Sequence, residues 1–418
     1  MEVDGSDVRG PLDVPAHQAF SGVDAHLQRV ITRQREQAAF QALSREMEAL
    51  PADSTALRAW LEADAISSRL VTSWPSADTG VDVGFDDCLC HYLGLALPSL
   101  VGVAGERIPD RRTPRHCDPH GEQLETAALS GGHQIDRSNA IRDVIAADVP
   151  GAQREPTGLF AHSLPQAVAA AVQGRGMRIG LRPDLSARTA FGQRPGRRAV
   201  QPALRGVVLF DVKQLTAGAP LYREGAHARS HQRGQPVAER ARRVHVEYEH
   251  HARELDRDTT ATWHLPSGAP YPAVREQQRL GLVGPVLAAL RGYPQVQGLV
   301  VGSWQGSSAG VHALAREAAE AQAASHWRLM GARSESEALG IYTSVVQARW
   351  SSTFWRSWVH VIHGRRPCVG RADDRALVGG PEPVGRGAHA AGGAAAYPCV
   401  GPAVVAGARA AAGLGGGG

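Results

Sequence analysis

The chain has 418 residues, a length that accommodates about one to three domains. Its 45 basic and 41 acidic residues give a formal net charge of +4, and this balance is too even to indicate a nucleic-acid partner by itself. No apolar run reaches the roughly 18–20 residues of a membrane span, and residues 1–30 lack the apolar segment of a signal peptide. We therefore expect an intracellular protein with no membrane partner, and a nuclear location stays open.

The first part of the chain predicts helices. Residues 1–22 show no sustained periodicity of apolar residues and are expected to be a flexible N-terminus. Residues 23–72 place apolar side chains at three-to-four spacing, and Pro51 divides them into two amphipathic helices. A short helix is expected at 84–96. We assign 23–130 as a helical region whose amphipathic pattern alone indicates packing rather than chemistry.

The centre of the chain alternates between strands and helices. Apolar runs and alternating patterns predict three strands in succession, followed by a helix, a strand and a helix. This order is typical of a mixed α/β fold, an α+β sheet covered by helices. The expected elements are a helix at 137–147, strands at 154–162, 177–189 and 204–213, a helix at 235–256, a strand at 296–304 and a helix at 310–330.

The last part of the chain combines a helical segment with a low-complexity tail. Trp350, Trp355 and Trp358 lie in the predicted helical segment 336–370. They fit either the buried face of a core helix or a surface that stacks on unpaired bases, and we favour the core helix. Residues 371–418 are rich in Ala and Gly, with too few large apolar side chains to form a core, and are expected to be disordered.

The stretch "VVLFDVK" at 207–213 contains the only lysine of the chain, Lys213. The apolar run before it predicts a buried strand, and strand periodicity places Asp211 and Lys213 on the same side. A hairpin between this strand and the preceding one would bring Asp184 of "LRPDL" beside Asp211. The simplest interpretation is an ion pair at the end of a strand, which contributes little stability when it is exposed.

The functional interpretation is a metal site. Two carboxylates from neighbouring strands provide the oxygen ligands that suit Mg²⁺. A metal held there would polarise a phosphoryl oxygen and lower the pKa of a bound water. The compact ammonium of Lys213 could then orient that water or neutralise charge on the phosphate, a role that a planar guanidinium performs differently.

Five short motifs follow one another in a single direction over residues 117–213. Together they resemble the PD-(D/E)xK, restriction-endonuclease-like nuclease superfamily, in particular the endonuclease domains of LINE-type retroelement proteins and related algal open reading frames. The ordered set is far more specific than an isolated D-x-K. The motifs are "CDPHGE" (117–122), "RSNAIRDVI" (137–145), "EPTGL" (155–159), "RPDL" (182–185) and "FDVK" (210–213).

The resemblance implies a nuclease core at 131–335 with the order helix, three strands, helix, strand. It implies a DNA endonuclease that hydrolyses phosphodiester bonds with Mg²⁺ or Mn²⁺. Asp184 and Asp211 would be the metal ligands, and Lys213 the catalytic base or charge stabiliser. Glu155 would add a third carboxylate from the first strand.

Arginines near these motifs are candidate DNA contacts. By the resemblance, Arg142 or Arg182 would touch the phosphate. Three others lie in the Arg/Gly/Pro-rich stretch 191–203 between the two aspartate motifs, which is either a phosphate-binding loop or a plain insertion. The candidates are Arg142, Arg182, Arg194, Arg197 and Arg198.

The related retroelement domains carry a zinc knuckle just before the core, and this chain departs from that pattern. The expected later ligands are replaced by Gln123 and Thr126. The remaining candidates have unconvincing spacing, so we expect inert thiols and no Zn²⁺ in a degenerate knuckle-like segment. These candidates are Cys88, Cys90, Cys117 and His120.

Three hypotheses remain open from the sequence. The retained Asp184, Asp211 and Lys213 favour an active endonuclease. The degraded zinc ligands, and Ser138 where the pattern prefers His, favour a catalytically inactive nucleic-acid-binding or interaction module. A decaying, non-functional copy is the third. The first hypothesis requires the two carboxylates to lie close enough to share one cation.

Overall fold

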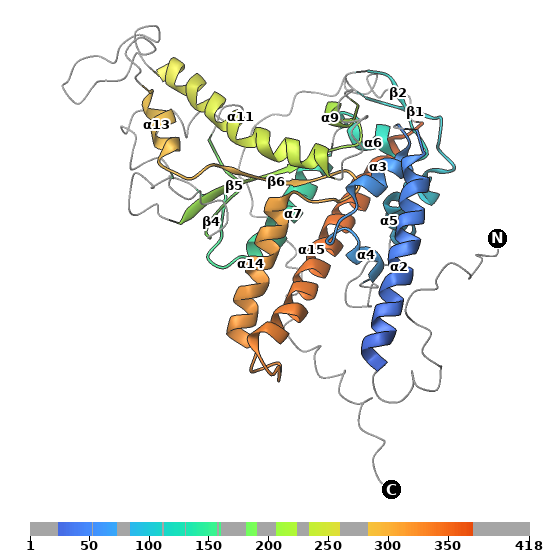
Figure 1. Cartoon of the computed structure of the whole chain (residues 1–418). Coiled ribbons are helices and arrows are strands. Elements are labelled where there is room, and N and C mark those ends of the chain that lie inside the picture. Colours follow the sequence, from blue (N-terminus) through green and yellow to red (C-terminus); the bar gives the residue numbers. More distant parts are fainter. Residues whose placement is uncertain are drawn as a thin grey trace.

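The computed structural model combines a mixed sheet with helices on both of its faces (Figure 1). Within the part of the chain that the structure describes, no helix is both long and apolar enough to cross a membrane. The described residues are 24–51, 53–72, 84–110, 113–129, 131–156, 159, 181–189, 206–223, 234–259 and 283–370.

The main sheet has four strands in the order β3-β4-β5-β6. β3 (Gln153–Arg154), β4 (Leu185–Arg188) and β5 (Val207–Gln214) are antiparallel neighbours, and β6 (Gln297–Val301) is parallel to β5. β5 is the longest of them and pairs on both sides. This central position explains why its residues are apolar on both faces except at the carboxyl end.

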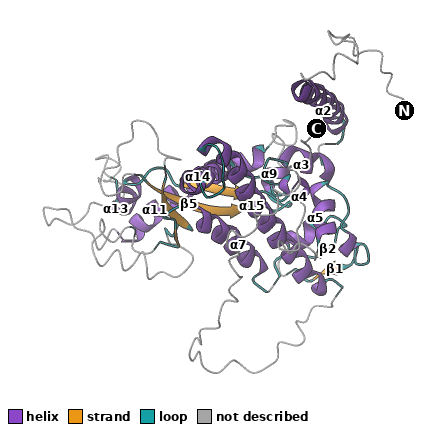
Figure 2. Ribbon diagram, turned by 90° about the horizontal axis from the view of Figure 1, so that it is seen from below, coloured by secondary structure: helices purple, strands orange, loops and turns teal. Residues whose placement is uncertain are grey.

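Helices cover both faces of this sheet. α7 (His133–Asp148), α14 (Ala309–His326) and α15 (Glu335–Arg365) pack below the strands in Figure 1, and Figure 2 shows the same helices from that side. α11 (Gln235–Thr259) and α13 (Pro285–Arg291) cover the opposite face. Each face of the sheet therefore has its own hydrophobic cluster, as expected for helices packed on a sheet.

The amphipathic pattern of α11 explains its position. Val244, Tyr248 and Leu255 are buried and recur at helical spacing, which confirms the predicted apolar face. The outer face carries ion pairs, including Arg240 Nη1 to Glu247 Oε1 at 2.6 Å. The arginines of this face are thus paired with glutamates of the same helix.

The N-terminal helices pack around the second half of α15. Trp350, Trp355 and Trp358 are fully buried along this helix, which confirms the core interpretation over base stacking. The Nε1 of Trp355 donates to the carbonyl of Ser67 at 3.1 Å. The elements beside α15 are α4 (Arg69–Thr72), α5 (Phe85–Tyr92), η3 (Pro98–Leu100), β1 (Arg107–Ile108) with its partner β2 (Arg115–His116), α6 (Glu122–Thr126) and η6 (Arg366–Cys368). α2 (Asp24–Glu48) packs against α3 (Thr55–Glu62), and α9 (Pro220–Arg223) packs against α11.

The first predicted strand differs from the structure. We expected it at 154–162, but the paired residues are only Gln153–Arg154. Glu155 has a φ of 41°, a left-handed conformation that interrupts an extended strand. Of the later residues in the predicted range, only 156 and 159 are described. The predicted tail 371–418 and residues 1–22 lie outside the described residues altogether.

Candidate metal centre

The register between β4 and β5 brings the two aspartates together. Leu185 is paired with Phe210, so the preceding residue Asp184 is opposite Asp211. Asp184 Oδ2 accepts a hydrogen bond from the amide of Val212 at 2.7 Å, and the two carboxyl groups share a hydrogen bond. The structure therefore unites two carboxylates that are separated by a long stretch of sequence.

Burial and mutual repulsion act on this pair. Burial, followed by the charge of Asp211 and their shared hydrogen bond, raises the pKa of Asp184 to about 7. The amide of Val212 and the charge of Lys213 act in the opposite direction. Two carboxylates this close do not ionise independently, because one negative charge disfavours the second. Burial and the neighbouring charge therefore both favour a proton on the Asp184 carboxyl group.

Lys213 lies beside the pair. Its Nζ is 2.7 Å from Asp211 Oδ2, and its side chain is 35% exposed whereas that of Asp211 is only 5% exposed. An ion pair with one nearly buried partner differs from the exposed pair of the simplest interpretation. The Lys213 ammonium thus pairs with a buried carboxylate while its side chain is partly exposed to solvent.

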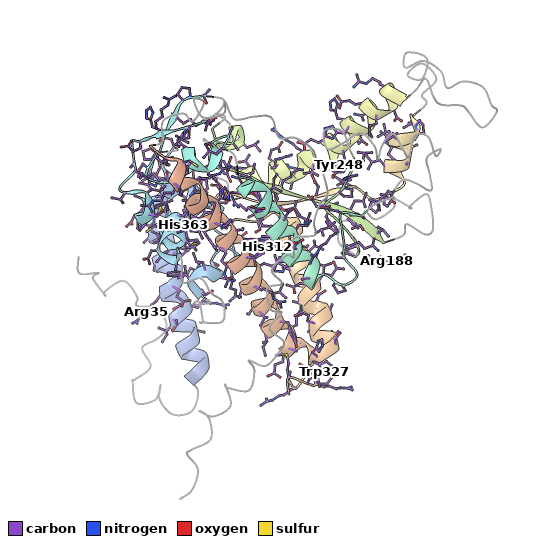
Figure 3. All side chains as sticks on the ribbon, turned by 180° about the vertical axis from the view of Figure 1, so that it is seen from behind. Arg35, Arg188, Tyr248, His312, Trp327 and His363 are labelled. Atoms are coloured by element: carbon purple, nitrogen blue, oxygen red, sulfur yellow. The ribbon has the colours of Figure 1, made fainter. Side chains whose placement is uncertain are left out.

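Tyr248 of α11, labelled in Figure 3, adjoins the carboxylate pair and was not recognised as a site residue from the sequence. Its hydroxyl donates to the carbonyl of Arg182 at 3.0 Å. Burial, then the charges of Asp211 and Asp184, raise the pKa of the Tyr248 hydroxyl. The one available signal was a phenol within an otherwise aliphatic helix face, since a buried Tyr hydroxyl needs a polar partner.

The structure does not bring all the predicted site residues into this cluster. The amide of Glu155 donates to the carbonyl of Asp184 at 2.8 Å, but its side chain is 64% exposed and pairs with Arg142. Arg142 Nε also lies 3.1 Å from Asp143. Glu155, predicted as the third carboxylate, and Arg142, predicted to touch the phosphate, are therefore paired with each other.

The other arginines predicted to contact DNA lie only partly within the described residues. The side chain of Arg182 is exposed beside the site. The three arginines of the loop between the aspartate motifs lie outside the described residues: Arg194, Arg197 and Arg198.

Cys88, Cys90 and Cys117 lie in or against the hydrophobic cluster beside α15. Cys88 and Cys117 are buried, and Cys88 Sγ donates to the carbonyl of Trp355 at 3.8 Å. Burial raises the pKa of Cys117 to about 11, and it also raises the pKa of Cys88. Metal binding by Cys requires the thiolate, which such burial disfavours.

A second group of buried acids lies at the end of β6 and was missed in the sequence. Glu62 accepts hydrogen bonds from the Tyr222 hydroxyl and from the amides of Trp304 at 2.8 Å and Gly306 at 3.2 Å. Burial raises the pKa of Glu62 to about 8. These contacts hold the loop after β6 against α3.

Glu125 and Arg137 continue this buried polar group. Arg137 Nη1 lies 2.7 Å from Glu125 Oε1, and the Ser303 hydroxyl donates to Glu125 Oε2 at 2.9 Å. Every contact here joins groups of the protein to each other. We therefore interpret this group as structural, in contrast to the carboxylate pair at Asp184.

Comparison with protein-family models, with curated proteins and with solved structures finds no match for this chain. The site must therefore be interpreted from its own geometry.

Replacing Asp184 with asparagine is expected to change how stability depends on pH in metal-free buffer. Because the folded-state pKa is raised to about 7, the wild type loses stability as pH rises from the unfolded-state value near ~4 through about 7. Asp184→Asn removes this loss and keeps an oxygen acceptor for Val212. The variant should therefore be more stable than wild type by roughly 1–3 kcal/mol at pH 8.

Urea unfolding at pH 5 and pH 8 measures this difference. Glu46→Gln, which removes an exposed carboxylate on α2, is the control and should keep the wild-type pH dependence. An Asp184→Asn variant with the same pH dependence as wild type would contradict the raised pKa.

Proposed function

We propose that this chain is a metal-dependent DNA endonuclease of the restriction-endonuclease-like type, derived from a retroelement. The observation that carries the proposal is the pairing of Asp184 with Asp211 next to Lys213, the only lysine of the chain. This constellation is the one that the PD-(D/E)xK resemblance requires.

The order of elements supports the same proposal. Among the described elements, α7, β3, β4, β5, α11 and β6 occur in the order helix, three strands, helix, strand. The short helix α9 lies between β5 and α11, and α13 lies between α11 and β6. The β6 strand lies beside β5 and parallel to it. The order agrees with that of the nuclease core, although order alone does not carry an activity.

The residues present fit a hard divalent cation. Asp184 and Asp211 offer carboxylate oxygens, the ligands that Mg²⁺ and Mn²⁺ prefer. The raised pKa of Asp184, caused first by burial and then by the charge of Asp211, supports this fit, because a cation would favour the ionised form of both carboxylates. When bound, the metal polarises a phosphoryl oxygen and lowers the pKa of a water. These two aspartates would hold it.

Lys213 has the position to act on the substrate. Its ammonium is held at Asp211 by the 2.7 Å contact, and its partial exposure gives it access to a backbone phosphate. We propose that it stabilises negative charge as the phosphodiester bond breaks, an electrostatic role that fixed charges perform well in a partly buried site. Tyr248 would hold the strand end in place through its bond to Arg182.

The alternative is an inactive nucleic-acid-binding or interaction module. It is favoured by the ion pair of Arg142 with Glu155, which keeps both groups away from a phosphate or a metal. Ser138, where the family prefers His, accepts a hydrogen bond from Gln214 at 3.2 Å. Under this alternative the carboxylate pair would persist without turnover.

The deciding experiment is nicking of supercoiled plasmid by the full chain with Mg²⁺ or Mn²⁺. We expect metal-dependent nicking that Asp184→Asn and Asp211→Asn each reduce by about 10³-fold or more, as is usual for loss of a central electrostatic group. Glu46→Gln, purified in parallel, should retain full activity, and a loss confined to the two aspartate variants would exclude a contaminating nuclease.

Absence of nicking by folded wild type, on double-stranded and single-stranded DNA, would overturn the proposal. Retention of DNA in a gel-shift assay would then support the binding module. Neither nicking nor binding would support the decaying copy.

A further inference from the structure

Three potential metal ligands meet at the start of α7, away from the carboxylate pair. His133 and Asp136 lie in the first turn of α7, and His360 lies near the end of α15. One ligand atom from each lies within 4.8 Å of the other two. His363, labelled in Figure 3, is one turn further along α15 and marks this end of the helix.

Among the described residues, no hydrogen bond or ion pair commits these side chains to another polar group. His133 Nδ1 is buried and has no hydrogen-bond partner. Asp136 and His360 are exposed, and among the described residues no side chain forms an ion pair with the Asp136 carboxylate. The rings of His133 and His360 meet edge to face with centroids 5.5 Å apart. An unpaired buried imidazole nitrogen calls for an explanation, and a ligand is one.

The backbone around His133 makes room for its ring. A Cβ atom at Gly364 would lie 2.6 Å from His133 Cε1, so only glycine allows α15 to pass this closely. Gly132, the residue before the helix, has a φ of 73°, which glycine adopts without strain. Gly364 on α15 thus leaves space for the His133 imidazole at the contact between the two helices.

The donor set selects a class of metal. Two imidazoles and one carboxylate suit Zn²⁺ and neighbouring transition ions, whereas Mg²⁺ prefers oxygen ligands alone. Ligand atoms about 2.0–2.1 Å from Zn²⁺ in a tetrahedral site lie roughly 3.4 Å apart. The exposed side chains of Asp136 and His360 can close the remaining gap by rotation. The positive N-terminal end of the α7 dipole disfavours a cation, and the negative charge of Asp136 offsets this effect.

We propose that His133, Asp136 and His360 bind a Zn²⁺-type transition-metal ion that links α7 to α15. Three protein ligands leave a further coordination position for water. α7 supports the carboxylate site through the contact of Ser138 with Gln214 of β5. The ion therefore fixes the helix behind that site, and its binding does not depend on the chain being a nuclease.

Metal titration of the chelator-treated full chain tests this proposal. Zn²⁺ binding is measured by calorimetry, and Co²⁺ is used as a spectroscopic probe of the ligands. We expect one Zn²⁺ per chain, a rise in melting temperature, and at least about a tenfold increase in Kd for His360→Ala and for Asp136→Asn. Both residues are exposed, so these variants should fold. His250→Ala, which removes an exposed histidine of α11, should bind as wild type does.

Two further results distinguish this site from other metal sites. In an Asp211→Asn background, which removes a ligand of the carboxylate pair, His360→Ala and Asp136→Asn should still raise the Kd for Zn²⁺, because the two sites use different residues. A Co²⁺ spectrum with sulfur-to-metal charge transfer would instead indicate cysteine ligands and overturn the proposal. So would an unchanged Kd in both His360→Ala and Asp136→Asn, or the absence of Zn²⁺ binding by wild type.

Discussion

A Lys213→Arg variant is expected to nick DNA at least about 100-fold more slowly than wild type, although the positive charge is retained. The ammonium of Lys213 lies 2.7 Å from Asp211 Oδ2, within a site closed by Asp184 and Tyr248. A guanidinium is planar and longer, and it presents its donors as a fork rather than at a point. It would be displaced from the position where charge develops on the phosphate.

The measurement is the single-turnover nicking rate at saturating metal, which separates the chemical step from binding. The matched control is Arg316→Lys, the reverse exchange at an exposed position of α14, and it should nick as wild type does. Circular dichroism verifies that each variant is folded. Equal rates for wild type and Lys213→Arg would show that any nearby positive charge suffices, and would contradict the proposed role.

The central strand β5 and the pairing of Asp211 with Asp184 could be predicted from the sequence, because both follow from the pattern of apolar and polar residues in two short segments. An apolar run followed by Asp211 and Lys213 indicates a buried strand with polar groups at its end. The only additional assumption was antiparallel pairing with the segment that contains Asp184, and the register confirms this pairing. Period-two alternation then determines which side chains share a face.

Other features depend on contacts that no local pattern contains. Glu155 turns toward Arg142 because of its left-handed backbone, which ends the strand where an extended pattern was expected. Tyr248 reaches the carboxylate pair only because α11 lies across the sheet. His133 meets His360 because α7 and α15 pack together, and helical periodicity predicts neither crossing.

The loop after β6 is another feature whose packing partner could not be predicted from the sequence. "GSWQGSS" at 302–308 indicates a Gly-rich turn after a buried strand, but its partner cannot be read from it. In the structure, a Cβ at Gly302 would lie 1.9 Å from the Glu62 carboxylate and one at Gly306 would lie 2.1 Å from the Glu62 carbonyl oxygen. The glycines are therefore required by a glutamate on α3, far away in the chain.

Replacing Glu62 with alanine is expected to destabilise the protein by about 3–5 kcal/mol. Glu62 is 4% exposed, and its loss would leave the Tyr222 hydroxyl and the amides of Trp304 and Gly306 without their acceptor. Unpaired buried donors cost more than the hydrogen bonds contribute. Glu62→Gln keeps an oxygen for the two amides and a polar group for Tyr222, so it should cost only about 1 kcal/mol or less at pH 6.

The pH dependence distinguishes the role of the acceptor from that of the charge. Burial raises the pKa of Glu62 to about 8, so the stability contributed by its protonated form is lost as pH rises through that value. Glu62→Gln lacks this loss and should equal or exceed the stability of wild type at pH 9. Urea unfolding at pH 6 and pH 9 measures both variants. If Glu62→Gln destabilises the protein as strongly as Glu62→Ala, the loop requires an ionised carboxylate at this position. If it does not, Glu62 acts as a neutral acceptor. The buried negative charge at the end of β6 is then that of Glu125, which is paired with Arg137.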